Sequence, residues 1–218
     1  MKIKINEKHL FIFDLDGTLV NAYRAVHKSL NYTRTRFGLS EVSYYDAKIK
    51  LGRGQNRFID TFFPGMDKEV VLNTYRSHHR KALIEYARLR SNAKQLLRML
   101  KLRGKTVAIA SNRPFNFTKF IAEYLGIKKY IDYILCADQV GHLKPDPTIL
   151  YMILKKLKIK KEQALYIGDM LIDYQTARSA GLDFIFIRGG SSESKQAKRI
   201  KCIKKVNNLI EVISINKS

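Results

Sequence analysis

The chain has 218 residues, and 45% of them are hydrophobic, which suffices for one sizeable core and excludes general disorder. It carries 41 Lys and Arg residues against 19 Asp and Glu residues, and this formal charge of +22 suggests an acidic partner: a nucleic acid, an anionic membrane or a phosphorylated substrate. No apolar run approaches the roughly 20 residues that a membrane helix needs, and the N-terminal residues lack a signal-peptide pattern.

Five short apolar runs predict buried strands, because each run is continuous and ends at polar or turn residues. They are Leu10–Phe13, Thr106–Ala110, Tyr133–Cys136, Ala164–Ile167 and Asp183–Ile187. Helical spacing of apolar residues is found between the later runs, at Ser91–Leu102, Pro114–Leu125 and Pro147–Leu157. This alternation predicts an α/β fold with a Rossmann-like parallel sheet flanked by helices.

Residues 21–88 interrupt the alternation. Their apolar residues follow helical spacing, no strand pattern is visible, and glycine-containing turns separate the segments. We therefore predict an α/β core domain of residues 1–20 and 89–218, with a small all-helical cap domain, residues 21–88, inserted after the first strand.

Acidic residues follow two of the predicted strands. Asp14 and Asp16 leave the first strand two positions apart, where Gly17 allows a turn, and Asp169 and Asp173 follow another strand. Open α/β sheets bind ligands at the carboxyl ends of their strands. A polar strand end or a helix cap explains one such acid more easily than four, and the mutual repulsion of four acids requires a cation. Hard carboxylate oxygens favour Mg²⁺.

Two further segments could bind an anion. Ser111 and Asn112 end the second strand just before a helix, so a hydroxyl, an amide and free main-chain N–H groups meet there, although an ordinary helix cap would look the same. Lys144 lies in a segment stiffened by Pro145 and Pro147; alone it would be read as a solvated charge.

Together these motifs resemble those of the haloacid dehalogenase-like hydrolases. The four segments that carry the resemblance, in the family's order, are residues 13–20 (FDLDGTLV), residues 110–112 (ASN), residues 144–147 (KPDP) and Gly168-Asp169 with Asp173. The helical insertion falls where this family has its α-helical cap. Within the family, the chain is most similar to members of the phosphoglycolate phosphatase and β-phosphoglucomutase type.

The resemblance implies roles for these residues. Asp14 would be the nucleophile that forms an aspartyl-phosphate, and Asp16 the general acid and then the base. Mg²⁺ would be held by Asp14, the Asp16 main-chain carbonyl and Asp169, with Asp173 completing or orienting this shell. The phosphoryl oxygens would be bound by Ser111, Asn112 and Lys144.

Substrate choice would fall to the cap. Arg53 lies in a glycine-flanked loop and could bind a second anionic group of the substrate, although a solvated loop arginine has the same pattern. Weaker candidates are Arg57, Tyr23 and His27. Arg113 neighbours the phosphate site and could cover its edge, whereas His78 and His79 fit surface or helix-packing positions better than metal ligands.

The function that follows is a phosphoric monoester hydrolase: a Mg²⁺-dependent phosphatase of a small phosphorylated metabolite. The first alternative is a sugar-phosphate mutase. Less favoured alternatives are a phosphatase of nucleotides or nucleic-acid ends, and a nucleic-acid-binding protein. The positive charge is spread evenly over both predicted domains, which argues against a dedicated nucleic-acid surface. Two widely separated cysteines, Cys136 and Cys202, indicate reduced thiols and a cytoplasmic protein. We expect no membrane partner, and a monomer or a homodimer.

Overall fold

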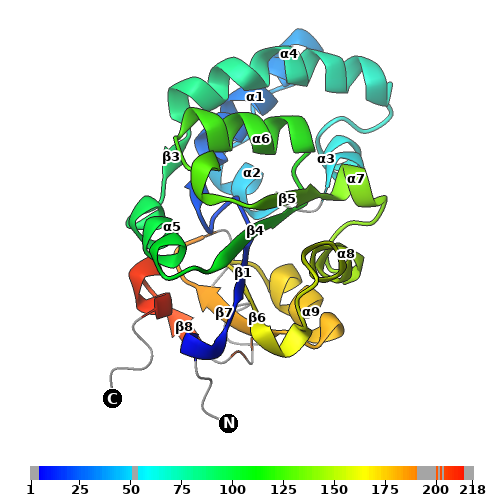
Figure 1. The fold of residues 1–218 in the computed structure, drawn as a ribbon. Coiled ribbons are helices and arrows are strands. Elements are labelled where there is room, and N and C mark those ends of the chain that lie inside the picture. The colour runs from blue at the N-terminus through cyan, green and yellow to red at the C-terminus, as the bar shows by residue number, and fades with distance from the viewer. Residues whose placement is uncertain (1–4, 51–53, 191–199, 201, 203, 214–218) are drawn as a thin grey trace.

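A six-stranded parallel sheet forms the centre of the fold (Figure 1). The computed structural model describes residues 5–50, 54–190, 200, 202 and 204–213. The strands of the sheet are β1 (Leu10–Phe13), β4 (Thr106–Ser111), β5 (Tyr133–Cys136), β6 (Ala164–Gly168), β7 (Asp183–Ile187) and β8 (Lys204–Val206). They lie in the order β5-β4-β1-β6-β7-β8, and all neighbours are parallel. The predicted fold class is confirmed, and each of the five expected strands is present.

Helices cover both faces of the sheet. The helices beside it are α5 (Ala93–Leu102), α6 (Phe115–Tyr124), α7 (Ala137–Val140), α8 (Thr148–Leu157) and α9 (Leu171–Ala180), with the short 3-10 segments η1 (Ile5–Glu7), η2 (Lys128–Tyr130), η3 (Lys161–Gln163) and η4 (Leu209–Ile213). In β1, Phe11 and Phe13 belong to the hydrophobic cluster under α5, α6 and η4, whereas Leu10 and Ile12 belong to the cluster under α8 and α9. The strand is therefore buried on both sides, which explains its continuous apolar run.

Four more helices form a layer beyond the carboxyl ends of the central strands, which we call the helical lobe (Figure 1). They are α1 (Tyr23–Arg36), α2 (Tyr44–Lys50), α3 (Gln55–Phe62) and α4 (Lys68–Tyr86). The lobe has a hydrophobic cluster of its own, which includes Leu30, Phe63 and Val71. Near the end of α4, Leu83 instead belongs to the hydrophobic cluster under α5, α6 and η4. The lobe is thus anchored to the sheet at one end of α4.

A short antiparallel pair joins the lobe to the sheet. It consists of β2 (Val20–Asn21) and β3 (Arg88–Leu89), with Asn21 opposite Arg88. The sequence predicted no strand in this region, and at these two ends that prediction is wrong. Each strand has only two residues, so no apolar periodicity exists to reveal it; the pairing of distant segments creates it. The segment that enters the lobe and the segment that leaves it therefore lie side by side.

The sheet has one more strand than the sequence predicts. The additional strand is β8, which pairs with β7 and in which Lys204 and Lys205 lie half-buried. Lysines are common on edge strands because they discourage pairing with another chain. Because these lysines interrupt any apolar run, the sequence did not predict this strand.

The central position of β1 determines where a ligand can bind. Phe13, the last residue of β1, lies in register with Ile109 of β4 and Ile167 of β6. The chain segments that leave these three strands are therefore neighbours at one edge of the sheet. Open α/β sheets bind ligands at this place.

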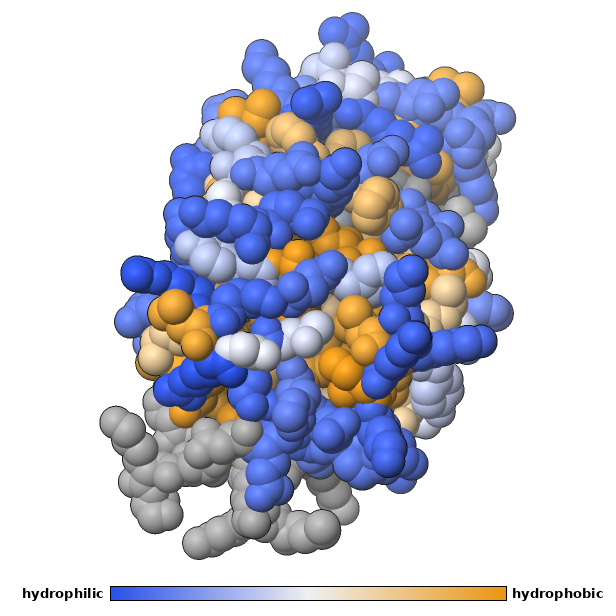
Figure 2. Space-filling view, viewed as in Figure 1, coloured by the Kyte–Doolittle hydropathy of each residue, from blue (hydrophilic) through white to orange (hydrophobic). Residues whose placement is uncertain are grey.

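The surface has no broad apolar face on the side shown in Figure 2, where hydrophilic residues surround smaller hydrophobic areas. Among the described residues, no helix combines the length and the apolar character needed to cross a bilayer.

We expect the buried position of Ile12 to be critical for stability. Replacing Ile12 with Ala should lower the free energy of unfolding by about 2–5 kcal/mol, since the side chain is 0% exposed in the central strand. The matched variant Ile84→Ala, at a side chain that is 43% exposed, should change it by about 0.5 kcal/mol or less. Urea unfolding measures both; equal losses would contradict the assigned core.

Candidate active site

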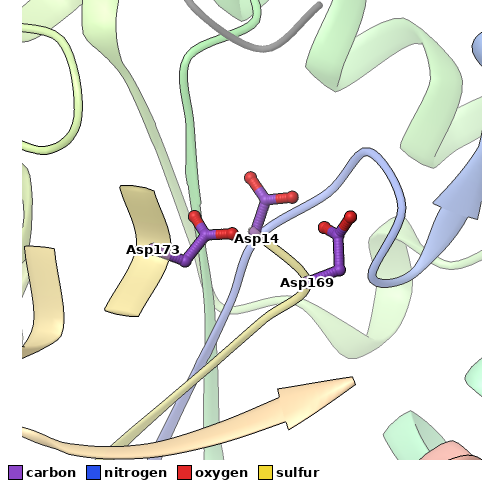
Figure 3. A group of neighbouring side chains, drawn as sticks. All are labelled: Asp14, Asp169 and Asp173. Atoms are coloured by element: carbon purple, nitrogen blue, oxygen red, sulfur yellow. The ribbon is translucent and has the colours of Figure 1, made fainter. Parts of the chain in front are cut away.

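Three aspartates meet above the carboxyl end of the sheet (Figure 3). Asp14 directly follows β1, Asp169 directly follows β6, and Asp173 lies in the first turn of α9. All three are buried, and each contributes a carboxylate oxygen to a group whose members lie within 4.8 Å of one another. Figure 3 shows Asp14 between the other two, with the carboxylates facing the same side. The structure thus joins three of the four acids that the sequence singled out.

Lys144 inserts its ammonium group among these acids. Its side chain is 2% exposed, and Nζ lies 2.6 Å from Asp14 Oδ1 and 2.7 Å from Asp173 Oδ1. The carbonyl oxygen of Ala110, at 3.1 Å, is a further acceptor. Burial by itself lowers the pKa of Lys144, but the two carboxylates outweigh it and hold this pKa well above its usual value. The ammonium group therefore stays charged.

Asp173 is fixed by three donors. Its Oδ1 accepts from Lys144 and, at 2.9 Å, from the hydroxyl of Tyr166. Its Oδ2 accepts from the main-chain N–H of Met170 at 2.9 Å, which also satisfies a free donor at the start of α9. Asp173 therefore holds Lys144 in place while capping a helix.

Asp169 accepts hydrogen bonds from Thr18, in the loop after β1, and from Tyr23, the first residue of α1. Thr18 donates its hydroxyl to Asp169 Oδ1 at 3.1 Å, and Tyr23 donates to Oδ2 at 3.3 Å. The Thr18 hydroxyl thus reaches from the loop after β1 to the end of β6. Gly17 has a φ of +90°, and a Cβ there or at Gly190 would collide with the Asp169 carboxylate. Glycine is required at both positions because the acid passes so close to the main chain.

The charge balance of this group fits a divalent cation. Three carboxylates face one ammonium group, which leaves a surplus of two negative charges in a buried space. Burial raises the pKa of Asp14 well above its usual range; Lys144 opposes this, while Asp173 and Asp169 add to it. The available donors are hard carboxylate oxygens, the type that Mg²⁺ prefers. The residues present therefore fit Mg²⁺.

The fourth acid has a different partner. Arg113 lies in the loop between β4 and α6, with an 8% exposed side chain, and it binds both oxygens of Asp16. Its Nε donates to Oδ2 at 2.7 Å and its Nη2 to Oδ1 at 2.9 Å, a two-pronged ion pair. The main-chain carbonyl oxygen of Asp16 takes no part in this ion pair and lies 3.3 Å from the Tyr23 hydroxyl oxygen. The carboxylate and the carbonyl of Asp16 are thus available for different tasks.

Ser111 and Asn112 occupy the end of β4, as predicted, but their side chains already have partners. Ser111 Oγ accepts from the main-chain N–H of Arg113 at 3.1 Å. The amide of Asn112 accepts from the main-chain N–H of Lys144 at 2.9 Å and donates to its carbonyl oxygen at 3.2 Å. The side chain of Asn112 therefore anchors the segment that carries Lys144.

A cavity of about 130 Å³ separates the sheet from the helical lobe. From the sheet side it is lined by Asp14, Asp16, Ser111, Asn112, Arg113 and Lys144. From the lobe it is lined mainly by apolar and aromatic side chains, namely Tyr23, Val26, Phe58, Leu72 and Tyr75, together with His79 and Lys50. Asp14, Asp16 and the anion-binding candidates therefore face one cavity.

The residues that the sequence proposed for substrate binding by the cap lie in different places. Arg53 lies outside the described residues. Tyr23 reaches the site, whereas Nε2 of His27 lies 2.8 Å from the carbonyl oxygen of Val42 inside the lobe. Arg57 is exposed and does not line the cavity.

Three site residues were missed in the sequence. Tyr166 gave a signal, because a phenol inside an apolar strand needs a polar partner once it is buried. Gly190 gave no signal, because only the fold brings it beside the Asp169 carboxylate. His79 was assigned to the surface or to helix packing, but it is buried and lies 2.8 Å from Arg113.

Comparison with known proteins agrees with this geometry. The family model described as haloacid dehalogenase-like hydrolase matches residues 11–187. A phosphoglycolate phosphatase of Aquifex aeolicus is 28% identical over 174 residues, which cover 79% of this chain and 81% of the relative. Another, from Colwellia psychrerythraea, is 29% identical over 200 residues, 86% of this chain and 88% of the relative. The family and these relatives confirm the expected enzyme class, a phosphoric monoester hydrolase.

Solved structures share the fold over nearly the whole chain. A predicted phosphoglycolate phosphatase from Haemophilus somnus superimposes with a TM-score of 0.86 at 23% identity, covering 97% of this chain and 99% of that one. A candidate β-phosphoglucomutase from Thermotoga maritima gives 0.77 at 18% identity, covering 96% and 98%. With the family match over most of its length, the chain belongs to the haloacid dehalogenase-like hydrolases.

Proposed function

We propose that this chain is a Mg²⁺-dependent phosphatase of a small phosphorylated metabolite, either phosphoglycolate-like or a sugar phosphate, acting through an aspartyl-phosphate on Asp14. The observation that carries the proposal is the buried group of Asp14, Asp169 and Asp173 with Lys144, beside a cavity that Asp14 and Lys144 line. The phosphoglycolate phosphatases among the relatives support the substrate class.

The proposed reaction has two displacements at phosphorus. A carboxylate oxygen of Asp14 attacks phosphorus, the bond to the leaving oxygen breaks, and Asp16 gives that oxygen its proton. A water molecule then attacks the aspartyl-phosphate and passes a proton to Asp16, so that phosphate leaves and Asp14 is restored. Together, the two steps replace one difficult hydrolysis by two easier displacements.

Electrostatics decide whether an anionic nucleophile can meet an anionic phosphate. Bound Mg²⁺, held by Asp14, the Asp16 carbonyl and Asp169, would supply two positive charges that offset this repulsion. Lys144 adds a third charge beside Asp14, and Asp173 keeps that ammonium group in position. Ser111 and the main-chain N–H groups before α6 would bind phosphoryl oxygens.

The size and lining of the cavity favour a small substrate. Its volume of about 130 Å³ is below the roughly 300–1,000 Å³ typical of pockets for drug-sized ligands. The helical lobe covers it, so we propose that residues 21–88 act as the cap and determine the substrate. A nucleic-acid strand would not fit beneath this cover.

A screen of phosphorylated metabolites with Mg²⁺ tests the function. The wild type should release phosphate from 2-phosphoglycolate or from a sugar phosphate in the panel, and Asp14→Asn should lower kcat by at least about 10³-fold because the nucleophile is removed. Phosphate release and isomer formation are measured together, so conversion of a sugar phosphate to its isomer would identify a mutase instead. Asp14→Asn should keep its fold, since it removes one of three buried like charges; normal turnover by this variant would contradict the mechanism.

Removal of the metal should affect both activity and stability. A chelator should abolish phosphate release, and added Mg²⁺ should restore it. Mg²⁺ at a hundred times its dissociation constant should stabilise the wild type by about 2.7 kcal/mol. Thermal unfolding measures this, and Asp169→Asn should reduce the shift. Full activity in excess chelator would overturn the metal assignment.

Lys144 should be essential for stability as well as for turnover. Lys144→Met leaves Asp14 and Asp173 buried without their cation, so the metal-free variant should lose about 3–5 kcal/mol of unfolding free energy. The double variant Lys144→Met/Asp14→Asn should lose less, because one uncompensated charge is gone. Urea unfolding measures the set, and strict additivity would argue against the buried pair.

A further inference from the structure

We infer that His79 is a positioning residue: from the helical lobe it orients Arg113, and through Arg113 it orients the Asp16 carboxylate for proton transfer. The inference rests on the proposed function, in which Asp16 moves the proton. It assigns a task to Arg113, which the sequence placed at the edge of the phosphate site, and to His79, which the sequence placed at the surface or in helix packing.

The guanidinium group of Arg113 bridges the sheet and the lobe. Two of its nitrogens donate to the two oxygens of Asp16, and the third, Nη1, lies 2.8 Å from Nε2 of His79. Arg113 belongs to the loop after β4, whereas His79 belongs to α4 of the lobe. Because a guanidinium group is planar and rigid, fixing Nη1 also fixes the direction of the fork on Asp16.

The protonation of His79 follows from its partners. Arg113 can only donate, so Nε2 of His79 must be the acceptor, and the ring proton must lie on Nδ1. Nδ1 is 3.0 Å from the hydroxyl oxygen of Ser29 in α1, which can accept it. The Ser29 hydroxyl lies 3.3 Å from Nδ1 of His78 and can donate onward. A single direction of donation therefore runs from Arg113 through His79 and Ser29 to His78.

The surroundings keep His79 neutral and its ring in one plane. Burial, then Arg113 and His78, hold the pKa of His79 well below its usual value. The ring stacks on Tyr75, with centroids 4.7 Å apart, and the edge contact with Phe117 has centroids 5.0 Å apart. Tyr75 lies in α4 and Phe117 in α6, so contacts from the lobe and from the sheet layer both fix the imidazole.

This arrangement makes the orientation of Asp16 depend on the lobe. If the lobe moves away, Nη1 of Arg113 loses its acceptor, and the guanidinium group is free to turn. The Asp16 carboxylate, whose two oxygens are both on that fork, then loses its fixed direction. Proton transfer depends on such geometry, and a misplacement of 1 Å can cost about 100-fold in rate. Closure of the lobe would thereby complete the site.

A comparison of two leaving groups separates positioning from simple packing. The substrates are 2-phosphoglycolate, or the alkyl phosphate that the wild type hydrolyses fastest in the panel, and p-nitrophenyl phosphate. An alkoxide needs a proton to leave, whereas nitrophenolate does not. With His79→Leu, kcat/KM should fall by about 10- to 100-fold for the alkyl phosphate and by less than about 3-fold for the aryl phosphate.

Matched variants complete the experiment. His79→Gln should recover most of the alkyl phosphate activity, because its side-chain oxygen can accept from Arg113. Ile84→Ala, at an exposed position of α4 outside the hydrogen-bond chain, should behave like the wild type. Equal losses for both substrates, or no recovery by His79→Gln, would overturn the inference while leaving the phosphatase standing. A wild type that hydrolyses neither substrate would overturn the proposed function, and the inference with it.

A spectroscopic measurement tests the hydrogen-bond chain without turnover. In ¹⁵N-histidine-labelled protein, which has five histidines, the signal that disappears in His79→Gln is that of His79. It should show a neutral ring with its proton on Nδ1, and it should shift in Arg113→Lys, which loses the fork. A proton on Nε2 would contradict the inferred contact.

Discussion

An ammonium group as deeply buried as that of Lys144 needs negative partners, and here two carboxylates, those of Asp14 and Asp173, lie within 2.7 Å of it. The group still carries more negative than positive charge once Asp169 is counted, and a divalent cation would balance it. Asp169 and Asp173 are each held by more than one donor, and Gly17 and Gly190 leave room for the Asp169 carboxylate. The remaining features of the site follow from this dense charge cluster.

The topology makes such a cluster possible. Because β1 lies between β4 and β6, residues from three distant parts of the chain reach one edge of the sheet. The same edge is covered by the helical lobe, whose entry and exit strands pair at Asn21 and Arg88. A chain with one sheet and one insertion thus buries Asp14, Lys144, Asp169 and Asp173. Enclosure strengthens every charge interaction within it, since water is displaced.

The sequence predicted the parts whose signal is local. The strands appear as continuous apolar runs, and the acids and Lys144 lie in short motifs at strand ends. The pairs β2 with β3 and β7 with β8 could not be predicted, because two-residue strands and a lysine-rich edge carry no periodic pattern. The partners of side chains were hidden for a similar reason: the Arg113 fork on Asp16 joins residues 97 positions apart. Spacing shows which residues are present, whereas the fold decides which of them touch.

The basic residues spread along the chain and the two buried in the site, Lys144 and Arg113, have different roles. Most of the 41 basic residues occur throughout the chain without clustering in one predicted domain, and they attract anionic metabolites only in a general way. Inside, Lys144 faces Asp14 and Arg113 faces Asp16, and each is paired with carboxylates from another part of the chain. These pairings differ in one respect: Lys144 is held entirely by the sheet and α9, while Arg113 also depends on His79 from the lobe. The contacts that hold Lys144 therefore do not involve the lobe, whereas those that hold Arg113 do.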